Sequence, residues 1–200
     1  MIKGWRPDSP APGRGEPPSK KAKKSKRSEE REPLTRQEVE QMALAYVNRF
    51  DVSASKLRQH LATRVRKAGG SDQASAWISE LVERYQSSGV LDDSRFAKNL
   101  ASQLSARGKS ARAIAQKLAV RGVSSEIADD LMSTRRADEP DAELEAARTY
   151  VRKRRLGPFR SAEKRAEFRH KDLATLARQG FSFDIAKKAL GPGASTEEEF

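Results

Sequence analysis

Residues 110–132 read SARAIAQKLAVRGVSSEIADDLM, and the fold can be predicted from the pattern in these residues. Ser110 is a helix-capping residue, and apolar residues that include Leu118 follow it at the spacing of one helical face. Gly122 ends that helix, because glycine accepts the positive φ angle of a helix C-terminus. Ser124 then caps another helix. The stretch therefore predicts two short helices joined by a tight glycine turn.

The same pattern recurs near the C-terminus. Residues 169–190, RHKDLATLARQGFSFDIAKKAL, align with residues 110–132 at an offset of 58. The aligned pairs are Leu118 with Leu176, Gly122 with Gly180, Val123 with Phe181, and Ile127 with Ile185. The shared order is a helix, a glycine stop, an apolar residue, a two-residue link and a second helix. An internal repeat of this kind indicates a tandem array.

A more degenerate copy lies upstream. At an offset of 57, the matching residues are Ser53 with Ser110, Leu57 with Ile114, and Leu61 with Leu118. This copy carries extra residues around Gly69-Gly70, where a glycine pair breaks the helical pattern. We therefore expect three unequal copies.

Helix caps and apolar stripes around these copies predict nine helices in three groups of three. The first helix begins at Thr35, where Thr35 and Glu38 form a capping box. The later helices are expected to begin at Ser53 or Ser55, about Asp72, Asp92, Ser110, Ser124, Pro140, Ser161 and Ser182. We place Pro140 in the first turn of the seventh helix, and Gly157-Pro158 at its end.

These patterns predict an all-α protein made of three tandem three-helix repeats. A unit of about 50 residues is too small to be very stable alone, so neighbouring units should stack into an elongated, curved array. We place the repeats at residues 34–89, 90–136 and 137–191. The flanking segments, a basic one at residues 1–33 and an acidic one at residues 192–200, are poor in large apolar side chains, and we expect them to be disordered.

Charge is the most informative part of the composition. The chain has a net charge of +12, and residues 34–191 alone carry 30 basic and 20 acidic side chains. Aromatic residues make up only 6% of the sequence and charged residues 34%, which favours helices with narrow apolar stripes. A basic body indicates a polyanionic partner.

Two clusters of basic residues are the candidates for contact with that partner. The first comprises Arg58, Arg64, Arg66 and Lys67, around the second helix. The denser second cluster comprises Arg152, Lys153, Arg154, Arg155, Arg160, Lys164, Arg165, Arg169 and Lys171. The alternative is an ordinary solvated helix face, because charge runs are common on exposed helices. Trp77 has the spacing of a packed helix face, so we assign it to the core rather than to base stacking.

The sequence offers little for catalysis. It contains no cysteine, and its two histidines, His60 and His170, lie in no metal-binding or catalytic pattern. Asp92 and Asp93 are better explained as a helix cap than as metal ligands. No glycine-rich phosphate loop is present. We therefore expect a protein that is not an enzyme and has no cofactor and no metal.

The sequence also bears on location and assembly. It has no apolar run of 18 or more residues, and its N-terminal segment lacks the apolar core that a signal peptide needs. We expect a cytoplasmic protein that does not span a membrane and acts as a monomer.

The start of the second repeat carries a resemblance to a known family. Residues 89–97, GVLDDSRFA, resemble the signature of the RecX family of bacterial recombination regulators, through Leu91, Asp92, Asp93 and Phe96. Residues 55–61 and 108–122 resemble helices of that family's first and second repeats. The resemblance spans about residues 34 to 191, with a fading third repeat, and Gly122 and Gly180 occupy structural positions in it.

The resemblance implies a protein that binds RecA, lies in the groove of the RecA filament on single-stranded DNA, and usually inhibits strand exchange and ATP hydrolysis. It implies no catalytic residues. Three features depart from the family pattern: the longer connection at residues 64–73, Asp172 in place of an apolar residue such as Ile114, and the N-terminal segment. Composition alone equally permits a stand-alone helical DNA- or RNA-binding module, such as a transcription regulator, or, as a third class, an adaptor for an acidic protein.

Overall fold

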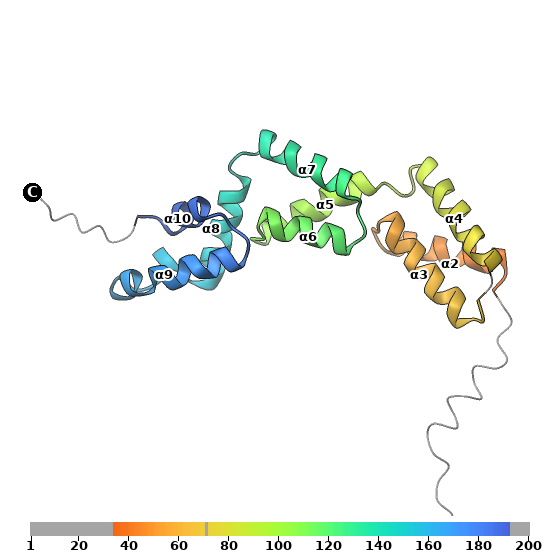
Figure 1. The fold of residues 1–200 in the computed structure, drawn as a ribbon, viewed down its shortest axis with the longest axis horizontal. Helices are drawn as coiled ribbons and strands as arrows, with labels where there is room; N and C mark the ends of the chain where they lie inside the picture. Colours follow the sequence, from red (N-terminus) through yellow and green to blue (C-terminus); the bar gives the residue numbers. More distant parts are fainter. Residues whose placement is uncertain (1–33, 71, 193–200) are drawn as a thin grey trace, which may run out of the picture.

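The computed structural model describes residues 34–70 and 72–192, and every regular element in these ranges is helical (Figure 1). The all-α prediction is therefore confirmed. The expectations for residues 1–33 and for the acidic residues 193–200 lie outside the described ranges.

Nine α-helices and one short 3₁₀ helix make up the described part of the chain. They are α2 (Arg36–Arg49), α3 (Ala54–Lys67), α4 (Asp72–Ser87), α5 (Asp93–Ala106), α6 (Ala111–Val120), α7 (Ser125–Asp138), α8 (Ala142–Arg154), η1 (Gly157–Phe159), α9 (Ala162–Arg178) and α10 (Phe183–Leu190). Groups of three follow one another along the long axis of the molecule (Figure 1). The result is an elongated array of three-helix units. Helix α7 ends two residues beyond position 136, where we expected the second repeat to end.

Six of the described helices begin at a residue whose side-chain oxygen caps the helix, whereas Asp141 before α8 and Ser161 before α9 make no such bond. Thr35 and Glu38 form the predicted capping box, in which the Thr35 hydroxyl accepts a hydrogen bond from the Glu38 amide and the Glu38 carboxylate accepts one from the Thr35 amide. Four serines cap later helices by accepting from the amide three residues ahead; they are Ser53, Ser110, Ser124 and Ser182. Of the two candidates for the second helix, Ser53 is thus the cap.

The glycine turns have the predicted geometry. Gly122 has a φ angle of 78°, and the following amide, of Val123, donates to the Leu118 carbonyl at 3.1 Å. The same bond joins Phe181 to Leu176 after Gly180. In each turn the residue after the glycine is buried, so that it packs back on the helix that has just ended.

Each group of three helices encloses its own small core. Fully buried members include Leu57 and Leu61 in the first group, Leu118 in the second and Leu176 in the third. Trp77 is half-buried against the first core, as predicted from its spacing. Because each core is small, contacts between groups matter for stability.

The ends of α8 differ from our prediction. The Ala142 amide donates to the Glu139 carbonyl at 3.0 Å, so Pro140 lies in a turn before the helix and not in its first turn. At the other end, Arg155 adopts the left-handed conformation, with φ 52°, and stops the helix. Gly157 does not end α8; it begins the 3₁₀ helix η1.

Candidate functional site

The first joint between repeats joins the start of α3 to the second group. The Ser53 hydroxyl, which caps α3, also donates to the Arg121 carbonyl at 2.5 Å. Beside it, the Ala54 amide donates to the Asp93 carboxylate at 2.8 Å. A Cβ atom on Gly122 would lie 2.6 Å from the Cβ of Ser55, which is closer than two such atoms can approach. The glycine is therefore required by the joint as well as by its own turn.

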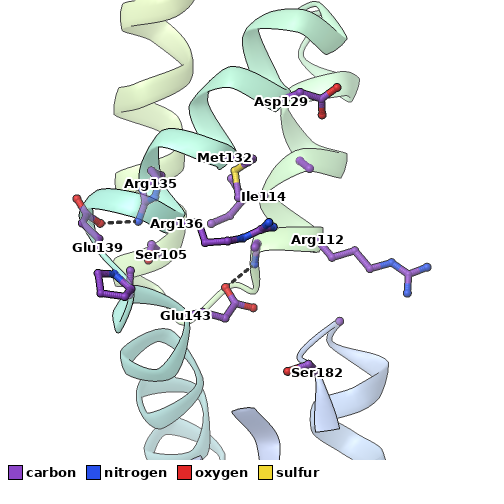
Figure 2. A pocket seen from close by; sticks show the side chains of 15 residues that line it. Ser105, Arg112, Ile114, Asp129, Met132, Arg135, Arg136, Glu139, Glu143 and Ser182 are labelled. Atoms are coloured by element: carbon purple, nitrogen blue, oxygen red, sulfur yellow. Dashed lines mark hydrogen bonds and ion pairs between the residues drawn. The ribbon is translucent and has the colours of Figure 1, made fainter. Parts of the chain in front are cut away.

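The second joint repeats this arrangement one unit further along. The Ser110 hydroxyl caps α6 and donates to the Gln179 carbonyl at 2.6 Å. The Ala111 amide donates to the Glu143 carboxylate at 2.8 Å (Figure 2). A Cβ atom on Gly180 would lie 2.8 Å from the Ser110 hydroxyl oxygen. Two equivalent hydrogen bonds thus form each joint, and these bonds hold neighbouring repeats together in the stacked array.

The LDD-containing motif lies across the first joint. Leu91 is buried in the core of the first group, whereas Phe96 is buried in the core of the second. Asp92 caps α5 by accepting from the Arg95 amide at 2.8 Å. Asp93 reaches back to α3. The motif therefore connects two repeats, and its residues have structural roles.

A pocket of about 480 Å³ lies where the second and third groups meet. Ile114 and Met132 supply apolar lining, Arg136 extends across it in the view of Figure 2, and Arg112 points away from it. Burial raises the pKa of Glu143, and this effect outweighs the hydrogen bond from Ala111 and the charge of Arg135, which both lower it. The pocket is thus a feature of the joint.

The first basic cluster lies on α3, with Arg58 in the first half of the helix and the other three residues in its last turn. Arg58, Arg64, Arg66 and Lys67 are all exposed, and no ion pair or side-chain hydrogen bond links them to another described residue. Burial, and then the charge of Arg64, lower the pKa of His60, whose ring stacks on Tyr46 at 3.9 Å between centroids. The four cations are therefore available to a polyanion.

In the second basic cluster, the structure separates two kinds of residue. Four side chains are exposed without a described hydrogen-bond, ion-pair or aromatic-ring contact: Arg152, Arg154, Arg155 and Lys164. The other five have internal contacts. Lys153 donates to the Arg107 carbonyl, and Arg169 donates to the Gly191 carbonyl. Arg165 donates to the carbonyls of Pro158 and Arg160. Arg160 pairs with Asp172, and Lys171 lies over the Phe168 ring.

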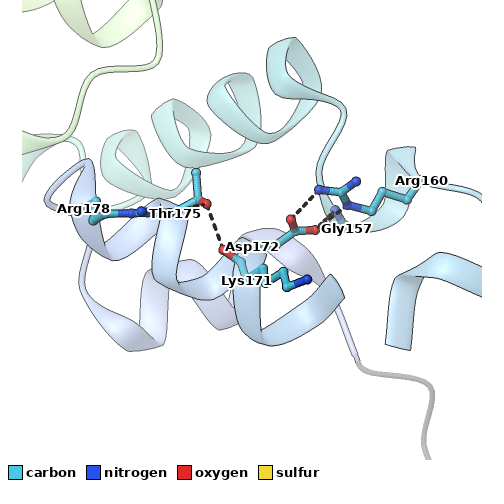
Figure 3. A network of polar contacts seen from close by, with 6 residues as sticks. All are labelled: Gly157, Arg160, Lys171, Asp172, Thr175 and Arg178. Atoms are coloured by element: carbon cyan, nitrogen blue, oxygen red, sulfur yellow. Dashed lines mark hydrogen bonds and ion pairs between the residues drawn. The ribbon is translucent and has the colours of Figure 1, made fainter. Parts of the chain in front are cut away.

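Asp172 is the centre of a buried polar network in the third group (Figure 3). Its side chain is 1% exposed, and it accepts two hydrogen bonds from Arg160, at 2.7 and 2.9 Å, and one from the Gly157 amide at 2.9 Å. Burial alone would raise the pKa of Asp172, but these bonds and the charge of Arg160 hold it below its ordinary value. Arg160 thus has a structural role within the third group, and its side chain stays 26% exposed.

Three comparisons with known proteins bear on the family. A sequence model described as the second three-helix domain of RecX matches residues 92–132. The regulatory protein RecX of Myxococcus xanthus is 39% identical over 183 residues, which cover 88% of this chain and 95% of the relative. The chain belongs to the RecX family. The regulatory protein RecX of Agrobacterium fabrum is 38% identical over 110 residues, 55% of each chain.

A solved RecX structure agrees with the fold. The crystal structure of RecX from Lactobacillus salivarius matches with a TM-score of 0.61 over 78% of this chain and 94% of that chain, at 18% identity. The comparisons support a RecX-type regulator, since the curated relatives are regulatory proteins. No helix among the described residues has the length and apolar character needed to cross a membrane.

For this RecX-family chain, the sequence identifies the motif but does not show that Asp93 connects two repeats. The sequence assigns Asp93 to the helix cap, whereas its carboxylate accepts from the first amide of α3. Its counterpart in the third repeat is Glu143, which no sequence motif marks. A signal was available, because each carboxylate lies in the first turn of the helix that opens its repeat.

Proposed function

We propose that this chain regulates a RecA-type recombinase by binding its filament on single-stranded DNA. It lies in the groove of the filament, bridges adjacent protomers, and inhibits strand exchange and ATP hydrolysis. The observation that carries this proposal is the match to a regulatory protein RecX along nearly the whole chain, through all three repeats. The RecA partner itself is what the family resemblance implies.

The shape of the molecule supports the proposal. Its three groups of helices extend along one axis, so the molecule can contact several subunits of a regular polymer (Figure 1). The two joints use the same hydrogen bonds, and a repeated joint gives a regular rotation from one unit to the next. A regular array fits a helical groove better than a compact body does.

The charge of the molecule supports it as well. Residues 34–191 have a net charge of +10. Eight exposed cations of the two basic clusters have no described ion-pair, hydrogen-bond or aromatic-ring contact: Arg58, Arg64, Arg66, Lys67, Arg152, Arg154, Arg155 and Lys164. Such side chains can displace counterions from phosphates, which makes binding to a DNA-containing filament favourable and dependent on salt.

The proposed activity needs no chemical step by this chain. A protein that bridges neighbouring protomers opposes the subunit movements that accompany ATP hydrolysis, and a monomer is sufficient for this. A RecA partner also implies that the chain acts in the cytoplasm.

The test is ATP hydrolysis by the cognate RecA on single-stranded DNA, with and without this protein, together with co-sedimentation with the filaments. We expect inhibition and co-sedimentation at near-stoichiometric amounts. No change in hydrolysis at excess and no co-sedimentation would contradict the proposal. Tight, sequence-selective binding to naked duplex DNA would instead favour the transcription-regulator alternative.

A further inference from the structure

The third repeat contains a turn that the other two lack. Four residues link the first and middle helices in the first repeat, at residues 50–53, and four do so in the second, at residues 107–110. In the third repeat, seven residues link α8 to α9, at residues 155–161, and they include the 3₁₀ helix η1. The extra residues are absent from the equivalent links, so the repeat itself does not require them.

This turn is held firmly in place. The Gly157 amide and the Arg160 guanidinium both donate to the buried Asp172 carboxylate (Figure 3). Arg165 donates to the carbonyls of Pro158 and Arg160, at 3.0 and 3.1 Å, and so clamps the backbone on either side of Phe159. A segment with this many hydrogen bonds presents its side chains in one preferred geometry, which lowers the entropic cost of binding.

At the centre of the turn, Phe159 faces solvent. The residue is 51% exposed, although the turn around it is well ordered by hydrogen bonds. The side chains of Arg154, Arg155 and Lys164, within five residues along the chain, are exposed and have no described ion-pair partner. An exposed aromatic ring on a rigid turn, flanked by unpaired cations, is the combination used to bind single-stranded nucleic acids.

We propose that Phe159 stacks on a base of single-stranded DNA, while Arg154, Arg155 and Lys164 contact the neighbouring phosphates. The inference rests on the proposed function, because a RecA filament is one place where this chain meets such a strand. A base is favoured over an apolar pocket of a protein partner because the flanking side chains are cationic and would oppose burial in an apolar surface. Phe159 is thus a direct nucleic-acid contact, and Asp172 acts as a positioning residue behind it.

The test is binding of the full chain to a fluorescently labelled oligothymidylate, without RecA, as a function of salt. Loss of one stacked base weakens binding by a factor of about 5 to 150, so we expect Phe159→Ala to lie in that range. For this variant, the slope of log affinity against log salt concentration should equal that of the unmodified chain, because no phosphate contact is removed. The matched control is Phe183→Ala, since Phe183 is 66% exposed in the same repeat, and its affinity should not change.

A spectroscopic variant tests stacking directly. With Phe159→Trp, the added indole fluorescence, above the background of Trp5 and Trp77, should be quenched by the oligothymidylate, whereas with Phe183→Trp it should not. If Phe159→Ala binds the oligothymidylate as tightly as the unmodified chain, the inference is overturned. If that variant instead loses only co-sedimentation with RecA filaments, Phe159 binds the protein and the inference is wrong. If the unmodified chain inhibits RecA but does not bind the oligothymidylate, the proposed function stands and this inference fails.

Discussion

Asp172 lies at a repeat position that the first two units fill with Leu57 and Ile114. All three side chains are buried, but the carboxylate must be compensated by charge and hydrogen bonds. Arg160 and the Gly157 amide provide this compensation, and in doing so they tie the residue 155–161 link to α9. A departure from the apolar pattern thus has a specific structural purpose.

Removal of this carboxylate should destabilise the chain. Asp172→Ala leaves Arg160 without its partner, and breaking a buried pair costs about 3 to 5 kcal/mol. We expect a loss near the lower limit, because the Arg160 side chain is 26% exposed and water can solvate it. The free energy of unfolding from urea denaturation measures the effect. Asp184→Ala, in the exposed part of α10, is the control and should change it by less than about 0.5 kcal/mol.

The same residue predicts a pH dependence. Its pKa in the folded state lies below the ordinary value of 3.8, so the ionised form stabilises the fold at pH values above 3.8, and this contribution is lost as the pH falls through the folded-state pKa. The difference in unfolding free energy between the unmodified chain and Asp172→Asn should therefore be constant near neutral pH and shrink below about pH 3.8. A difference that grows on acidification would contradict this assignment.

At the scale of the element, α5 begins with two aspartates that have different tasks. Asp92 caps its own helix, whereas Asp93 accepts from the first amide of α3 in the preceding repeat. Asp93→Ala leaves that amide unsatisfied, at a cost of about 1 to 3 kcal/mol, and frees the first two repeats to change their relative orientation. We expect small-angle X-ray scattering to detect a changed molecular shape. Asp92→Ala should cost about 1 kcal/mol but keep the shape.

Helix α6 offers a direct test of the core of the second repeat. Leu118 is fully buried, so Leu118→Ala should lower the free energy of unfolding by about 2 to 5 kcal/mol. Val120, two residues along the same helix, is 64% exposed, and Val120→Ala should change it by less than about 0.5 kcal/mol. Equal effects of the two substitutions in thermal or urea denaturation would show that our assignment of the buried face is wrong.

At the scale of the whole molecule, the arrangement of charge should decide binding. Arg152 and Arg154 are exposed near the end of α8, and reversing both to Glu should weaken binding to single-stranded DNA. The double substitution should also make the affinity less dependent on salt. The slope of log affinity against log salt concentration should become shallower by about 0.7 for each phosphate that is no longer neutralised. The control reverses Lys98 and Lys117, exposed in the second repeat, and changes the net charge equally. If both variants flatten the slope equally, total charge and not this cluster governs binding.

The helices, most of their serine and threonine caps and the glycine turns can be predicted from the sequence, because these features depend on residues three to five positions apart. The prediction fails at Arg155, where a non-glycine residue takes the left-handed conformation and ends α8. The joints are visible only in the folded protein, because their hydrogen bonds join residues 32 to 69 positions apart. The tertiary structure also separates the exposed arginines from Arg160, since Asp172 meets that guanidinium only after α9 has packed.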